Sequence, residues 1–170
     1  MNKIPLEPLH VVVEDRRATG QEPLISDDEM AVLAEVLVGV LAAEGTESGA
    51  EAGLIVVDAA EMSDLNVEHM GETGPTDVLS FPIDGAGGGV GWIVGDVIVC
   101  AEVAAAQAEG HSGSVEDEFR LMVVHGGLHL CGWDHDTDAK QTEMWAREKH
   151  LMAELGVSPS GDPWGLDEHG

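Results

Sequence analysis

The chain has 170 residues with 33 acidic and 7 basic side chains, a formal net charge of −26. A surface of this charge repels DNA, binds nucleic acid only at a locally compensated site, and favours basic partners. The length suits one domain, no apolar run reaches transmembrane length, and the N-terminus lacks a signal-peptide core, so we expect a cytoplasmic protein without a membrane partner.

Hydrophobic patterning predicts nine elements between residues 9 and 155. In chain order we expect strand 9–14, helix 26–45, strand 54–57, helix 59–67, strands 77–81 and 92–99, and helices 101–109, 115–131 and 137–155. Ser26 and Glu29 have the spacing of a capping box, which opens the first helix. A loop containing Gly and Pro is expected over 68–76.

These elements predict an α+β fold. We expect a single domain over 9–155, in which a small mixed four-stranded sheet packs with about five helices. The remaining 156–170 are rich in Gly, Pro and Asp, and we expect a disordered acidic tail there. The glycine run at 85–89 lacks the lysine and the strand–loop–helix setting of a phosphate-binding loop, so no chemistry is assigned to it.

The most informative pattern is a group of three histidines, His125, His129 and His135. The first two are four residues apart and therefore share one face of a helix. Gly132 favours a left-handed turn that ends this helix and can return His135 to the same side. Three neutral imidazoles leave the fourth tetrahedral position of a zinc ion to water, the arrangement of a catalytic site.

The alternative for these histidines is a helix end whose imidazoles find other partners. The surrounding helix is apolar nearly all round, so it should be central, and a buried imidazole needs a partner. We therefore predict one Zn²⁺ per chain, held on a central helix. Cys100 and Cys131 make no disulfide framework, and Cys131 lies on another helix face from His129, so we expect a packed thiol there.

Three blocks of sequence resemble the YbeY family of bacterial ribosomal RNA maturation factors. Residues 75–82 read PTDVLSFP, 95–99 read GDVIV and 125–135 read HGGLHLCGWDH. Their order and spacing match the family over roughly 9–155. The chain is also similar to actinobacterial-type members.

The resemblance implies an α+β, metal-dependent endoribonuclease that acts on single-stranded RNA. Members are described as processing ribosomal RNA, including the 3′ end of small-subunit rRNA, and as acting in ribosome quality control. It implies zinc bound by His125, His129 and His135. The implied partners are an rRNA precursor and small-subunit ribosomal proteins or assembly factors.

Two positions depart from the family pattern. Met70 stands where many members carry an arginine, and Trp133 replaces the usual tyrosine. Loss of the arginine removes a bidentate phosphate clamp, although actinobacterial-type members resemble this chain there. The remaining cations on or after the motif helix, each more often a solvated surface charge than a ligand contact, are Arg120, Lys140, Arg147 and Lys149.

Two carboxylates are candidates for proton transfer, Asp134 and Asp77. Asp134 adjoins the third histidine and could instead orient an imidazole, while Asp77, like Ser80, could instead cap or line the sheet edge. A zinc ion could support either attack by bound hydroxide or attack by the adjacent 2′-hydroxyl, and the residues do not choose between them.

Two other functions remain open. The spacing from His129 to His135 matches the second half of the metzincin pattern, but that class of zinc peptidase carries a general-base Glu where this chain has Gly126. A non-catalytic ribosome-assembly factor, stabilised by its metal, would use the acidic surface to bind basic proteins.

Overall fold

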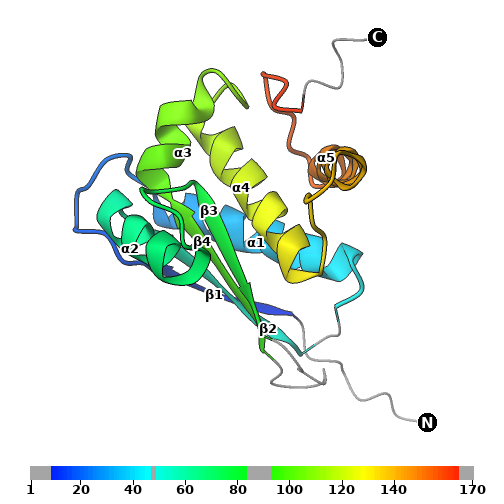
Figure 1. Ribbon diagram of the computed structural model, residues 1–170, viewed down its shortest axis with the longest axis horizontal. Coiled ribbons are helices and arrows are strands. Elements are labelled where there is room, and N and C mark those ends of the chain that lie inside the picture. Colours follow the sequence, from blue (N-terminus) through cyan, green and yellow to red (C-terminus); the bar gives the residue numbers. More distant parts are fainter. Residues whose placement is uncertain (1–8, 47–48, 84–92, 165–170) are drawn as a thin grey trace.

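The computed structural model describes residues 9–46, 49–83 and 93–164. Within them the elements are β1 (His10–Asp15), α1 (Asp27–Ala43), β2 (Glu51–Val57), α2 (Ala59–Met70), β3 (Val78–Pro82), β4 (Ile93–Cys100), α3 (Ala101–Ala108), α4 (Val115–Leu130) and α5 (Asp138–Glu154). This order confirms the predicted α+β class (Figure 1). The glycine run at 85–89 lies outside the described residues.

The four strands form one mixed sheet in the order β1-β2-β4-β3. Strands β1, β2 and β4 are parallel, while β3 runs antiparallel to β4. Gly95 in β4 has a φ of 147°, and a Cβ there would lie 2.3 Å from the carbonyl oxygen of Phe81. Glycine at this position therefore permits β3 and β4 to approach closely.

The sheet has a large core on one face and a small one on the other. Ala52, Leu54 and Val56 of β2 belong to the large core, which also contains residues of α1, α4 and α5. The alternate residue Val57 joins the small core with Met62 of α2. Helix α4 runs through the middle of the larger helical layer, between α3 and α5 (Figure 1).

Most helix ends agree with the predicted signals. Ser26 Oγ accepts a hydrogen bond from the backbone N–H of Glu29 at 3.0 Å, as its capping role requires. The predicted end of α2 was too early: the helix continues to Met70 and ends at Gly71, which has a φ of 70°. Because Gly71 supplies the left-handed conformation, the loop begins there rather than at residue 68.

The C-terminal segment differs from the predicted tail. Residues 156–164 are described, and Val157 and Trp164 are buried against the domain. The backbone N–H of Gly161 also donates to the carbonyl of Ser112 at 2.7 Å. The indole adds apolar area and a donor that a composition-based prediction does not weigh. Residues 165–170 lie outside the described part of the chain.

Among the described residues, no helix is both long enough and apolar enough to span a membrane.

Candidate metal centre

The three motif histidines come together at the C-terminal end of α4. His125 and His129 lie one turn apart on this helix. Gly132 has a φ of 97° and donates its N–H to the carbonyl of His129 at 3.1 Å, while the Trp133 N–H donates to the carbonyl of Leu128 at 3.1 Å. This pair of bonds defines a Schellman motif. The turn reverses the chain and brings His135 beside the helix.

Hydrogen bonds fix the tautomer of two of these imidazoles. Nδ1 of His129 lies 2.7 Å from the carbonyl oxygen of Trp133, which can only accept, so this nitrogen is the donor. Nδ1 of His125 donates in the same way to a carboxylate oxygen of Glu148. In each neutral ring the lone pair is therefore on Nε2.

These two Nε2 atoms are 3.0 Å apart, so in the neutral rings their two lone pairs face each other. His135 completes the group, and the ligating atoms of all three residues lie within 4.8 Å of one another. In the described residues this is the one group of three or more potential ligands with such spacing. The arrangement fits a divalent cation, which would accept the facing lone pairs.

Burial lowers the pKa of His129, and the neighbouring His125 lowers it further. The charged imidazolium is disfavoured where the ring is desolvated and close to another cationic ring. A neutral imidazole is the form that binds a metal ion. The environment of His129 thus favours the ligand form.

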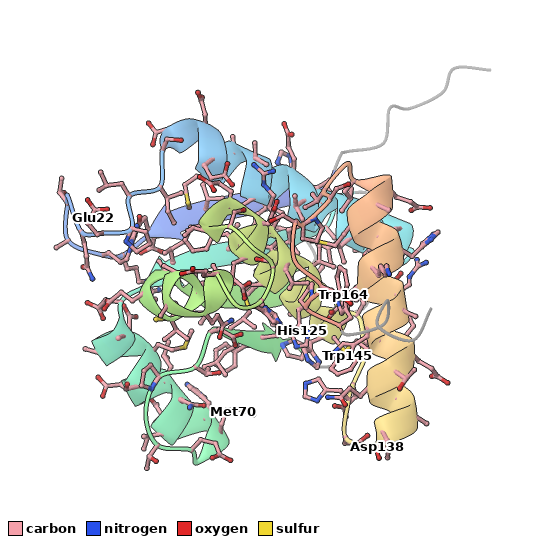
Figure 2. All side chains as sticks on the ribbon, turned by 90° about the horizontal axis from the view of Figure 1, so that it is seen from above. Glu22, Met70, His125, Asp138, Trp145 and Trp164 are labelled. Carbon is pink, nitrogen blue, oxygen red and sulfur yellow. The ribbon has the colours of Figure 1, made fainter. Side chains whose placement is uncertain are left out.

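Glu148, the acceptor for His125, was not among the predicted site residues. This carboxylate is 2 % exposed, and its second oxygen accepts from Trp164 Nε1 at 2.9 Å. A signal was present in the sequence, because Glu148 interrupts the buried stripe of α5 formed by Met144, Leu151 and Met152. A charged residue within such a stripe indicates a buried polar contact. Figure 2 shows Trp164 and Trp145 close to His125.

Gly126, which follows the first ligand, faces the sheet. A Cβ at this position would lie 2.6 Å from Val97 Cγ1 and 3.1 Å from Ser80 Oγ. The Ser80 hydroxyl donates to the Gly126 carbonyl at 2.9 Å. A glutamate at position 126 would therefore be directed into the packed interface between α4 and the sheet, not toward the histidines.

The two candidate carboxylates differ in exposure and in hydrogen-bond partners. Asp134 is exposed, and its Oδ1 accepts from the backbone N–H of His135 at 2.7 Å. Asp77 is half-buried, accepting from the Val78 N–H at 2.8 Å and from Gln107 Nε2 at 2.9 Å. Both interactions orient a carboxylate near the motif.

A cavity of about 170 Å³ adjoins the first histidine. Its lining includes Asp77, His111, His125, Trp145 and Trp164. The candidate carboxylate Asp77 therefore shares a solvent-accessible space with a candidate metal ligand. Met70, by contrast, is 58 % exposed at the end of α2 and lies away from the labelled tryptophans (Figure 2).

Three of the cations near the motif helix are engaged by carboxylates. Arg120 pairs with Glu29 at 3.0 Å, and Arg147 pairs with Glu44 at 2.6 Å. Lys140 lies 3.3 Å from Asp136, one helical turn away in sequence. These ion pairs neutralise the positive charges locally.

Both cysteines are free thiols. Burial raises the pKa of Cys131, which keeps it in the thiol form. Cys131 does not belong to the histidine group and packs against the large core, as expected from its helix face.

Fold and site together define a single-domain α+β protein that carries three converging imidazoles at the end of a central helix. The model of the family described as Endoribonuclease YbeY matches residues 17–156. The chain belongs to this family, which confirms the resemblance carried by the three sequence blocks.

Several relatives support this membership. A protein named Endoribonuclease YbeY from Thermobifida fusca is 46% identical over 110 residues, covering 61% of this chain and 71% of the relative. A Bacillus licheniformis protein of the same name is 32% identical over 160 residues, covering 89% and 99%. The solution structure of TM1509 from Thermotoga maritima has a TM-score of 0.57 at 25% identity, covering 90% of this chain and 97% of that one.

Proposed function

We propose that this protein is a zinc-dependent endoribonuclease that cleaves single-stranded regions of ribosomal RNA precursors, including the 3′ end of small-subunit rRNA. We also propose a part in ribosome quality control. The observation that carries this proposal is the convergence of two Nε2 lone pairs and His135 in a chain of the YbeY family.

His125, His129 and His135 would hold one Zn²⁺ per chain. When bound, such an ion lowers the pKa of a coordinated water to about 7 and polarises a phosphoryl oxygen. The chain contributes orientation: the Nδ1 hydrogen bonds of His125 and His129 keep both Nε2 atoms available before any ion arrives. Three protein ligands leave room for water or a phosphate oxygen.

Asp77 and Asp134 are the proposed proton-transfer residues. The role of Asp77 is supported by its position in the cavity beside His125. The role of Asp134 is supported by its hydrogen bond to the backbone of His135, the third proposed ligand. The ends of the RNA products distinguish two routes, because a 2′,3′-cyclic phosphate requires attack by the adjacent 2′-hydroxyl.

The charge of the phosphate must be balanced on a very acidic protein. Arg120, Lys140 and Arg147 are paired with carboxylates, so the proposal assigns this role to the metal ion. The net charge of −26 supports basic small-subunit ribosomal proteins or assembly factors as further partners.

The packing of Gly126 argues against a zinc peptidase of the metzincin type. That reaction needs a carboxylate at this position to accept a proton. The position lies against Val97 and Ser80, and even a Cβ atom there would require these neighbours to shift. A non-catalytic assembly factor has the acidic surface in its favour and is the remaining alternative.

The direct test uses the zinc-loaded protein and a His129→Ala variant. Each is incubated with rRNA fragments that contain single-stranded segments, and with a peptide library. We expect RNA cleavage by the parent protein and none by the variant. Binding to pre-ribosomal particles without cleavage would favour the assembly factor, and peptide cleavage would favour a peptidase.

A further inference from the structure

A buried carboxylate connects three parts of the molecule behind the metal centre. One oxygen of Glu148 on α5 accepts from His125 Nδ1 on α4, and the other accepts from Trp164 Nε1 in the C-terminal segment at 2.9 Å. Glu148 is 2 % exposed and Trp164 is 7 % exposed. Two hydrogen bonds through Glu148 therefore connect Trp164 to His125, a candidate metal ligand.

Burying a carboxylate is costly unless charged or hydrogen-bonding partners compensate. Two neutral donors, an imidazole and an indole, compensate Glu148 only in part. A cation bound at Nε2 of His125 would polarise the ring and strengthen its Nδ1–H donor. The buried negative charge and an ion on the far side of the ring thus favour each other.

We propose that Glu148 is a positioning residue for the metal centre and that Trp164 holds Glu148 in place. The inference rests on the proposed role of His125 as a metal ligand. Glu148 fixes His125 as the Nδ1–H tautomer and sets the ring plane so that Nε2 meets Nε2 of His129. The C-terminal segment then contributes to metal affinity without contacting the ion.

The test is zinc affinity, measured by competition with a chromophoric chelator, together with thermal unfolding of the metal-free proteins. For Glu148→Ala we expect the zinc dissociation constant to rise by about 10- to 100-fold, the usual effect of losing such a partner. Glu148→Gln keeps an acceptor oxygen but loses the charge, and we expect a smaller rise. This second variant keeps the test valid if Glu148→Ala does not fold.

Glu118→Gln is the matched control for buried charge. Glu118 is 0 % exposed and accepts from His111, which is not in the group of candidate ligands. We expect it to lower the melting temperature of the metal-free protein without changing zinc affinity. A merely structural role for Glu148 would give the same pattern in its own variants.

Trp164→Phe and Trp145→Phe form a second matched pair. Both residues line the same cavity and both substitutions remove an indole N–H, but of these two indoles the one that donates to Glu148 is Trp164. We expect a rise of a few-fold in the zinc dissociation constant for Trp164→Phe and no change for Trp145→Phe.

The outcomes separate this inference from the function it rests on. If the parent protein and His125→Ala bind zinc equally, the metal centre itself is refuted. If the parent binds zinc and His125→Ala does not, unchanged affinity in both Glu148 variants overturns the positioning role and leaves the proposed function standing.

Discussion

Among the described residues, two buried glutamates each pair with a histidine, Glu148 with His125 and Glu118 with His111, and of these two histidines His125 alone belongs to the candidate metal site. His125 donates from Nδ1 to Glu148, while Nδ1 of His111 lies 2.9 and 3.0 Å from the two oxygens of Glu118. Both glutamates are almost wholly buried. A comparison of the two pairs therefore shows how the effect of an Nδ1 hydrogen bond on a histidine depends on the surrounding residues.

The surroundings of the two glutamates differ. Glu118, on α4, also accepts from Gln107 Nε2 on α3 at 2.7 Å and from the N–H of Ser112, in the connection between the two helices, at 3.3 Å. Glu148 instead joins α5 to α4 and to the C-terminal segment. The hydrogen bonds of Glu118 hold the loop between α3 and α4. The hydrogen bond from His125 to Glu148 positions the His125 ring, whose Nε2 faces Nε2 of His129.

The largest expected difference between the pairs comes from removing each imidazole. His125→Ala deletes one of three proposed ligands, and we expect zinc affinity to fall by more than about 100-fold, exceeding the loss of an outer partner. His111→Ala deletes the matching ring of the other pair and should leave zinc affinity unchanged. Equilibrium dialysis with metal analysis measures both. Equal loss in the two variants would remove the distinction between the pairs.

Zinc should also stabilise the fold by binding His125 of the first pair, and His111 of the second pair should make no contribution. At a free zinc concentration of about 100 times the dissociation constant, binding to the native state adds about 2.7 kcal/mol to the free energy of unfolding. For a domain of this size that corresponds to a rise of roughly 5 to 10 °C in melting temperature. We expect this rise in the parent and in His111→Ala, measured by calorimetry, and its absence in His125→Ala at the same zinc concentration.

A smaller effect concerns the close packing of α4 at its motif end. Gly126→Ala places a methyl group 2.6 Å from Val97 Cγ1, so the helix or the sheet must shift. Overpacking costs about 1 to 3 kcal/mol, partly offset by up to about 1 kcal/mol of helix propensity. We expect a net loss of up to about 2 kcal/mol in urea unfolding of the metal-free protein. A gain in stability would show that this interface is looser than the structure indicates.

The two pairs also show what sequence could predict. The His125 and His129 spacing and the turn at Gly132 are local, so the helical period and one glycine were enough to predict a three-histidine group. Glu148 is 23 residues beyond His125 in sequence, and its contact depends on how α5 packs against α4. No local rule specifies that packing.

For the fold as well, the local elements were predictable from the sequence and the long-range arrangement was not. Strands and helices followed from β-branched runs, apolar periodicity and the Ser26 cap. Strand order did not, because pairing β2 with β4 and placing β3 at an edge depends on long-range contacts. The packing of residues 156–164 was not predictable from composition, because one buried indole, Trp164, outweighs the polar residues around it.

The most direct test of the metal centre is the protonation of its imidazoles, read from two-bond ¹H–¹⁵N spectra at neutral pH. We expect Nδ1–H tautomers for His125 and His129 in the metal-free protein. On addition of zinc, the Nε2 resonances of both should shift while His111 stays unchanged. A proton on Nε2 of His125, or a spectrum that zinc does not alter, would contradict it.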